Sequence, residues 1–268
     1  MDAVLNGPVL FCECAHTQNI PDERRRTMRA ALAECGRTVI AVDDLCGLAA
    51  ARDPRLETIA AADSATIFAC YPRAVRWLLD WADRPLNLKR TQILNMRTTH
   101  VEALLAAIGA TAPAIESDAA EPAPAAQHAV QPEWRPWFPV IDFERCTNCR
   151  QCVTFCLFGV YVCDAAGRVT VQNPANCKNN CPACARMCPH AAIMFPKIEE
   201  HSPISGSLLD PAQTPDKVRL SRDALFGAPN ALDAIRKRGR RRPALLNNTP
   251  RQNPHGHPID PTHARRDG

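Results

Sequence analysis

The chain has 268 residues and a formal net charge of +4, which is enough length for one or two domains. No run of 18 or more apolar residues occurs, which excludes a membrane-spanning helix, and the acidic Asp2 argues against a secretory signal. We therefore expect a cytoplasmic protein. Nine of its 14 cysteines lie between Cys146 and Cys188. In a reducing compartment such clustering is more typical of metal ligands than of disulfides.

Residues 1–109 are predicted to form an α/β domain with a doubly wound, mainly parallel sheet. Short apolar segments alternate there with helical patterns: strands are expected at about 9–12, 38–42, 65–70 and 92–95, and helices at about 21–35, 56–62, 72–82 and 99–108. Nearly continuous apolar strands that alternate with helices are typical of a parallel sheet covered on both faces. The side chains of Arg24–Arg26 and Asp43–Asp44 are expected to face solvent.

Four early cysteines follow the ends of predicted strands. Cys12 and Cys14 end the first strand, Cys46 follows the second, and Cys70 ends the third. Because the carboxyl ends of parallel strands meet at one edge of a sheet, we expect the four thiols to gather there, with the first two on one side of an extended segment. They are candidate ligands of an additional [4Fe–4S] cluster. Buried small side chains are the alternative. A reactive dithiol is a third reading, although no basic residue lies beside the first pair in sequence. Cys35 is expected in the core.

The same region resembles the amino-terminal domain of the flavin-containing A subunit of heterodisulfide reductase. The segments 9–14, 44–46 and 67–73 carry the resemblance. In that family the domain is associated with an additional iron–sulfur cluster at the entry to an electron-transfer assembly, which implies the same four cysteines as ligands. The chain has no G-x-G-x-x-G and no G-x-x-x-x-G-K-[ST] motif, so a bound flavin or NAD is not expected.

Two segments have compositions that argue against a packed core. Residues 110–132 contain nine Ala and four Pro and are predicted to be an extended linker. Residues 201–268 are predicted to be a largely disordered basic tail, in which Arg236–Arg242 has six cations in seven residues. Such a run can bind nucleic acid or an anionic partner, and a solvated tail is the alternative.

Residues 133–200 contain eight cysteines in two runs. The first run reads C-x2-C-x2-C-x3-C, and the second reads C-x3-C-x2-C-x3-C. Three thiolates at this spacing can wrap one cubane, while the next helical turn carries the fourth cysteine to the other cubane. The spacing therefore predicts two [4Fe–4S] clusters with crossed ligands: Cys146, Cys149, Cys152 and Cys188 for cluster I, and Cys177, Cys181, Cys184 and Cys156 for cluster II.

The two runs depart from the ideal pattern at two positions. One residue is added between Cys177 and Cys181, and Leu157 stands where the second run has Pro189. The alternatives to the clusters are two zinc sites of four cysteines each and a set of disulfides.

The two halves of residues 133–200, each with one cysteine run, also resemble each other outside the ligand positions. Gly159–Val162 follows the first run as Ala192–Phe195 follows the second, so each is expected to form a short strand. Residues 164–167 are predicted to form a hairpin turn. Cys163 lies outside both runs and is expected to be a small buried residue.

Phe138–Asp142 before the first run and Cys188-Pro189 at the end of the second resemble bacterial-type dicluster ferredoxin domains. The resemblance implies a small α+β ferredoxin-like fold that passes single electrons at low potential. The hypothesis is thus a non-catalytic electron carrier or redox-complex subunit, whose partner is a redox enzyme or another carrier and not a membrane. Alternatives are an iron–sulfur redox or iron sensor with a nucleic-acid-binding tail, and a subunit of a heterodisulfide-reductase-like oxidoreductase.

Overall fold

The computed structural model of the chain describes residues 6–110 and 135–208. All described residues belong to one compact unit. Nearly the whole predicted linker and the predicted tail from residue 209 onward, including Arg236–Arg242, lie outside the described residues. Within the described ranges, no helix is long and apolar enough to cross a membrane.

A sheet of four parallel strands forms the centre of the amino-terminal part. The strands are β1 (Val9–Cys12), β2 (Val39–Val42), β3 (Ala65–Ala69) and β4 (Thr91–Asn95), and their order in the sheet is β2-β1-β3-β4. In the register, Leu10 pairs with Ile40 on one side and with Ile67 on the other. All residues of β1 and β3 are buried, as expected for central strands covered on both faces. The predicted α/β class with a parallel sheet is confirmed.

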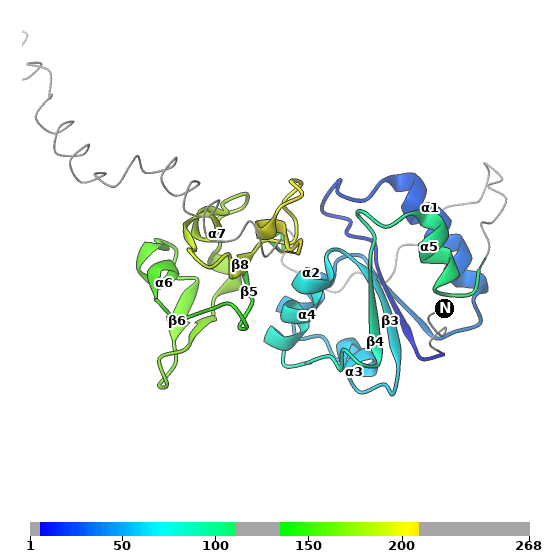
Figure 1. Ribbon diagram of the computed structural model, residues 1–268, viewed down its shortest axis with the longest axis horizontal. Coiled ribbons are helices and arrows are strands. Elements are labelled where there is room, and N and C mark those ends of the chain that lie inside the picture. The colour runs from blue at the N-terminus through cyan, green and yellow to red at the C-terminus, as the bar shows by residue number, and fades with distance from the viewer. Residues whose placement is uncertain (1–5, 111–134, 209–268) are drawn as a thin grey trace, which may run out of the picture. The chain divides into compact units, whose positions relative to one another are not determined.

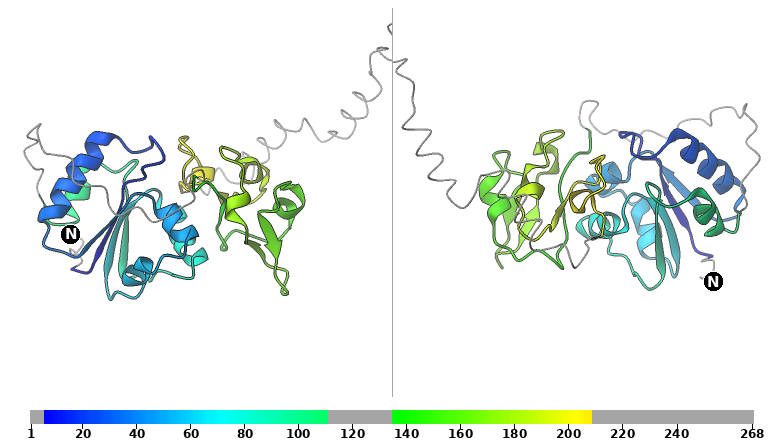
Figure 2. Two further views of the ribbon diagram at one scale, coloured as in Figure 1. Left: turned by 180° about the vertical axis from the view of Figure 1, so that it is seen from behind. Right: turned by 45° about the horizontal axis from the view of Figure 1, so that its top comes forward.

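Helices cover both faces of this sheet. α1 (Asp22–Glu34) and α5 (Val101–Ala106) lie on one face, and α2 (Leu45–Ala50) and α4 (Pro72–Trp81) lie on the other (Figure 1). The two further views in Figure 2 show the same layers, and the short α3 (Arg55–Ala60) leads into β3. Because β1 and β3 are neighbours whose following helices lie on opposite faces, their carboxyl ends form a switch point, where open α/β sheets bind ligands.

Arg24 and Arg25 of α1 do not face solvent as expected for Arg24–Arg26. Arg24 donates a hydrogen bond to the carbonyl of Met96 at 2.6 Å, and Arg25 donates to the carbonyl of Ile20 at 2.8 Å. Both side chains are half-buried, and only Arg26 is exposed. A guanidinium has five N–H donors, so it stays hydrogen-bonded when neighbouring carbonyls replace water.

The prediction that Asp44 faces solvent is wrong. Asp44 is only 5% exposed, because it caps the amino terminus of α2 and accepts a hydrogen bond from the backbone N–H of Gly47 at 2.9 Å. Asp43 is half-buried. The sequence patterns do not predict α2, because six residues are too few to display a helical period.

Residues 135–208 contain two pairs of short antiparallel strands and two short helices. The strands are β5 (Val140–Ile141), which pairs with β8 (Ile193–Met194), and β6 (Tyr161–Cys163), which pairs with β7 (Val169–Val171). The helices are α6 (Gln151–Phe155) and α7 (Ala183–Met187), and the 3-10 turns are η1 (Pro174–Asn176) and η2 (Pro203–Ser205). The hairpin turn expected at 164–167 joins β6 to β7, with Gly167 donating to the carbonyl of Asp164 at 2.9 Å.

The repeat between the halves has a different register from the one that the sequence suggests. Gly159 and Ala191 both have a left-handed backbone, with φ of 64° and 47°. Each lies two residues before a strand, β6 or β8, and three residues after the last cysteine of a run. Gly159 therefore matches Ala191 rather than Ala192, so Tyr161 at the start of β6 matches Ile193 at the start of β8.

The cysteine-rich part packs directly against the α/β part within this compact unit. Arg73 of α4 donates to the carboxylate of Asp142 and to the carbonyl of Ala191, both at 2.6 Å, and the indole N–H of Trp81 donates to the carbonyl of Val171 at 2.8 Å. Three apolar residues of the cysteine-rich part belong to the same buried core as the sheet: Phe138, Val140 and Met194.

The ordered contacts continue past His201, where the tail is expected to begin. The Tyr71 hydroxyl and His201 Nδ1 are hydrogen-bonded at 2.6 Å. Gly206, at φ 106°, lies so close to α4 that a Cβ on it would approach the Cβ of Ala74 to 2.7 Å. The described fold therefore extends to residue 208.

Candidate metal centres

The four early cysteines lie around the carboxyl ends of β1 and β3. Cys12 is the last residue of β1, Cys46 is in the first turn of α2, and Cys70 directly follows β3. All four side chains are buried, including that of Cys14. This arrangement follows from the parallel sheet, because strands that run in the same direction end at the same edge.

Cys12 and Cys14 come together by a geometry other than the expected one. Cys14 has a left-handed backbone with φ of 56°, so the chain turns after Cys12 instead of continuing as an extended segment. The Cys12 thiol donates a hydrogen bond to the sulfur of Cys14, and the backbone N–H of Leu45 donates to the sulfur of Cys12 at 3.3 Å. The turn brings the first two sulfurs close enough for each to shift the pKa of the other.

The other two sulfurs interact electrostatically with this pair. The charges of Cys70 and Cys14 act to raise the pKa of Cys46, and the charge of Cys14 acts to raise the pKa of Cys70. Burial raises the pKa of Cys46, and it raises the pKa of Cys70 to about 12. The hydrogen bond with Cys14, followed by burial, raises the pKa of Cys12. The structure therefore brings the four sulfurs of this set, which we call the rim cysteines, into one mutually interacting group.

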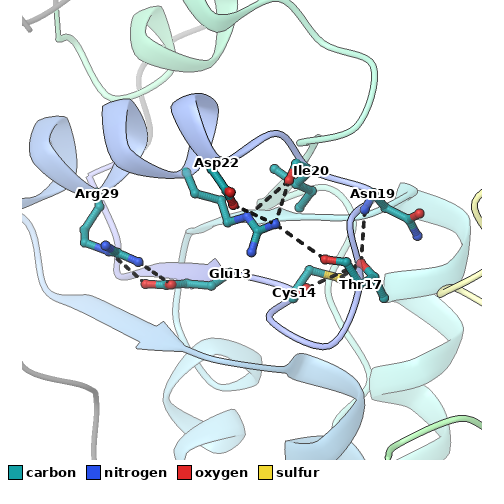
Figure 3. A network of polar contacts seen from close by, with 8 residues as sticks. Glu13, Cys14, Thr17, Asn19, Ile20, Asp22 and Arg29 are labelled. Carbon is teal, nitrogen blue, oxygen red and sulfur yellow. Dashed lines mark hydrogen bonds and ion pairs between the residues drawn. The ribbon is translucent and has the colours of Figure 1, made fainter. Parts of the chain in front are cut away.

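Cys14 differs from the other rim cysteines in its acidity. The hydrogen bond from Cys12 lowers the pKa of Cys14 to about 7, although burial acts in the opposite direction. The Thr17 hydroxyl donates to the sulfur of Cys14 at 3.6 Å, and the same oxygen accepts from the backbone N–H of Asn19 at 3.3 Å (Figure 3). The loop that follows β1 thus wraps back over the sulfur of Cys14.

Sequence reasoning missed a buried cation beside the rim cysteines. Lys197 forms an ion pair with Asp44, and the two side chains are only 5% and 7% exposed. Burial acts to lower the pKa of Lys197, but the charges of Cys46 and Asp44 raise it overall. The positive charge of Lys197 acts to lower the pKa of Cys14, whereas the negative charge of Asp44 acts to raise it. No local signal identifies Lys197, because lysine side chains are almost never fully buried.

The loop segment that carries Lys197 is fixed from two sides. The side-chain amide of Asn19 donates to the carbonyl of Lys197 at 3.2 Å, and Arg97 donates to the carbonyl of Glu199 at 2.6 Å. The guanidinium of Arg97 also lies 4.7 Å from the ring centroid of Tyr71. Its positive charge opposes the rise that burial causes in the pKa of Cys70. The rim cysteines therefore have two cationic side chains nearby, neither of which is close to them in sequence.

The eight later cysteines form two groups whose members come from both runs. In the first group, burial and the charges of Cys188 and Cys149 raise the pKa of Cys146. Burial and the charges of Cys146, of Cys184 from the second run and of Cys188 raise the pKa of Cys152. The same four residues line one cavity, together with Cys184. In this group the last cysteine of the second run lies beside the first three of the first run.

The second group has the complementary composition. The charges of Cys181 and Cys156 act to raise the pKa of Cys177, and the charges of Cys177 and Cys156 act to raise the pKa of Cys184. Burial is the largest cause that raises the pKa of Cys177 and of Cys184 to about 12. Here the last cysteine of the first run lies beside the first three of the second run.

Backbone and side-chain donors point at the sulfurs of both groups. The backbone of Val153 hydrogen-bonds Cys152, and the backbone of Ala185 hydrogen-bonds Cys184. In addition, the buried hydroxyl of Tyr161 donates to the sulfur of Cys184 at 3.0 Å. Burial raises the pKa of Tyr161, and the negative charge of Cys184 raises it further. This donor could have been found from the sequence, since Tyr161 follows the first run where the second run has Ile193.

Two cysteines lie outside these groups. Cys163 is exposed at the end of β6, so the prediction that it is buried is wrong. The hairpin carries the strand end away from the core, and the alternation of buried and exposed positions is lost there. Cys35 is half-buried at the end of α1 and packs against the core, and its thiol donates to the carbonyl of Leu32 at 3.1 Å.

The donor chemistry of the three groups suits iron–sulfur clusters, since each offers four sulfur atoms with few competing oxygen or nitrogen ligands. Within residues 6–110 and 135–208, no three His, Cys, Asp or Glu side chains are arranged tightly enough to bind one metal ion. The four ligands of a cubane bind four different iron atoms, so a cubane needs a wider arrangement than a single ion.

Comparison with known proteins gives one informative match. No protein-family model matches the chain. The chain is 48% identical over 61 residues to an uncharacterized ferredoxin of Methanocaldococcus jannaschii. This similarity supports a ferredoxin-like domain in the chain. The match covers 22% of this chain and 41% of the relative, so the chain spans less than half the length of the ferredoxin that it matches.

Proposed function

We propose that the chain is an iron–sulfur electron carrier that passes single low-potential electrons between redox partners through two [4Fe–4S] clusters. Cluster I is held by Cys146, Cys149, Cys152 and Cys188, and cluster II by Cys177, Cys181, Cys184 and Cys156. The similarity to a ferredoxin supports this function at the level of the domain. The grouping of the sulfurs carries the ligand assignment, because each group joins three cysteines of one run to the last cysteine of the other.

When bound, each cluster supplies a site that accepts and releases one electron. The chain's own residues shield and orient this site. Ile141 and Ile193 line the cavity of the first group, and Tyr161 packs in the same buried cluster as Cys184. The apolar walls limit the access of water to the sulfurs, of which Cys184 is buried and Cys149 is exposed, and the backbone N–H donors compensate part of their negative charge. Burial and these hydrogen bonds set the potential at which the electron is held.

We further propose that the rim cysteines, Cys12, Cys14, Cys46 and Cys70, hold a third [4Fe–4S] cluster. Support comes from their convergence at the switch point of the sheet, where a ligand is expected. The buried Lys197 is a second support, because at Cys46 its positive charge lowers the pKa more than the charge of Asp44 raises it, and a cation stabilises an anionic group bound by thiolates. The resemblance to the A subunit of heterodisulfide reductase favours the same ligands and a position in a larger redox assembly.

Counting iron and sulfide in anaerobically purified protein tests both proposals. We expect about twelve iron atoms per chain, with an equal amount of labile sulfide. A variant with Cys12→Ser and Cys46→Ser should retain about eight, because the ferredoxin-like domain keeps its own ligands. About eight iron atoms in the unmodified chain would refute the third cluster alone, and an absence of labile sulfide would refute the electron-carrier function.

The partner is proposed to be a redox enzyme or another electron carrier. A catalytic dithiol at Cys12 and Cys14 is a second candidate function, favoured by their hydrogen bond and by the pKa of about 7 at Cys14. Iron analysis separates the two functions. Loss of iron in the Cys14→Ser variant supports a cluster ligand, whereas loss of disulfide turnover with unchanged iron supports the dithiol.

A further inference from the structure

We propose that Tyr161 raises the reduction potential of cluster II and leaves that of cluster I unchanged, because its hydroxyl donates to a ligand of cluster II alone. This inference rests on the proposed function, because it needs a cluster at Cys184. Tyr161 is not a proposed ligand itself and acts through the ligand Cys184, so it is a positioning residue.

The contact that carries the proposal joins the two halves of the domain. Tyr161 begins β6, which follows the first run, and Cys184 belongs to α7 in the second run. The hydroxyl donates to the Cys184 sulfur at 3.0 Å, and the two residues are 5% and 8% exposed. The hydrogen bond is therefore shielded from water, where a dipole acts more strongly on a nearby charge than it does in solvent.

The repeat shows that cluster I has no side-chain hydroxyl donor at the position equivalent to Tyr161. A shift of 32 residues relates Cys152 to Cys184, Val153 to Ala185 and Tyr161 to Ile193. The backbone hydrogen bonds to the two cysteines are present in both halves, from Val153 and from Ala185. Ile193 is buried like Tyr161, but its side chain has no polar atom. The two halves thus agree in the backbone donors to Cys152 and Cys184 and differ in this side-chain donor, while cluster I has a further backbone donor from Ala192 to the sulfur of Cys188 at 3.4 Å.

The sign of the effect follows from charge. Reduction adds one negative charge to a cluster, and part of that charge lies on the cysteine sulfurs. A hydroxyl that points its proton at one of these sulfurs stabilises the reduced form more than the oxidised form. The potential of cluster II is therefore higher with the hydroxyl than without it, and removing only the hydroxyl should lower it.

The test is a redox titration of the full-length holoprotein monitored by low-temperature electron paramagnetic resonance. In the Tyr161→Phe variant, we expect one of the two cluster signals of the ferredoxin-like domain to shift to a more negative potential and the other to stay. The ring remains to fill its site, so iron content should stay unchanged. Tyr71→Phe is the matched control, since Tyr71 is the only other tyrosine in the chain and its hydroxyl pairs with His201.

Two ligand variants identify which signal moves. The signal shifted by Tyr161→Phe should be the one altered by Cys181→Ser, and the signal altered by Cys149→Ser should not shift. Unshifted potentials, equal shifts of both signals, or a shift of the Cys149-dependent signal would each overturn the proposal. Loss of iron from the Tyr161→Phe variant would overturn it too, because Tyr161 would then be needed to retain the cluster. An unmodified protein without clusters would instead refute the proposed function itself.

A second readout does not depend on potentials. Electron–nuclear double resonance of cluster II, recorded before and after exchange into deuterium oxide, should detect the hydroxyl hydrogen beside the Cys184 sulfur as a proton signal that is replaced by a deuterium signal. This signal should be absent from Tyr161→Phe and present in Tyr71→Phe. Identical spectra for the unmodified protein and Tyr161→Phe would contradict the hydrogen bond on which the proposal depends.

Discussion

Lys197 and Asp44 form a buried ion pair although 153 residues separate them in sequence. Asp44 also caps the helix that carries Cys46, and Lys197 follows the last strand of the ferredoxin-like domain. One pair of charges therefore connects the edge of the parallel sheet to the end of the cysteine-rich part. The surroundings of the rim cysteines are completed only when both parts of the compact unit are folded.

We predict that Lys197→Met destabilises the protein by about 3–5 kcal/mol, because it leaves the Asp44 carboxylate buried without its partner. Urea unfolding of the full chain measures the loss. The double variant Asp44→Asn with Lys197→Met should recover much of it, since neither charge then remains. Lys89→Met is the control, because Lys89 is exposed. Equal unfolding midpoints for Lys197→Met and the unmodified chain would show that the pair contributes nothing to stability.

The ion pair between Arg73 and Asp142 gives a second prediction, with a control on the same helix. The two side chains are 9% and 5% exposed, whereas the neighbouring pair of Arg76 with Glu144 has a carboxylate that is 62% exposed. Arg73→Met should cost about 3–5 kcal/mol of unfolding free energy, and Arg76→Met less than about 1 kcal/mol. Thermal or urea unfolding compares them. Similar losses for both variants would contradict the importance of burial.

Cysteines outside the three groups should be dispensable for metal binding. Cys163→Ser and Cys35→Ser are expected to retain the full iron content, because neither sulfur interacts with a candidate ligand group. Cys152→Ser is the comparison, since Cys152 interacts with other ligands of its group. Iron analysis after anaerobic purification measures the difference. A Cys163→Ser variant that lost about four iron atoms would make Cys163 a ligand and overturn the assignment.

The sequence predicts the parallel sheet and the convergence of Cys12, Cys46 and Cys70 well. Apolar strands and helix-length patterns are local signals, and a parallel sheet then places the strand ends at one edge. The turn at Cys14 was not predictable in this way. Its left-handed backbone depends on contacts with the loop that follows, so the alternation of a strand is the wrong guide there.

The side chains around the sulfurs were harder to predict than the ligands. Cysteine spacing indicates the ligands directly, because adjacent thiolates in a run must reach one cluster. Lys197 and Arg97 reach the rim cysteines through tertiary packing, which has no signature in local sequence. The error at Asp44 has the same cause, because its burial depends on the distant Lys197 as well as on the helix that it caps.

The crossed arrangement of ligands is tested most directly by spin-resonance spectra of single-ligand variants of the reduced holoprotein. We predict that Cys156→Ser alters the same cluster signal as Cys181→Ser, and that Cys188→Ser alters the same signal as Cys149→Ser. If Cys156→Ser instead altered the signal that depends on Cys149, each run would serve its own cluster and the assignment would be wrong.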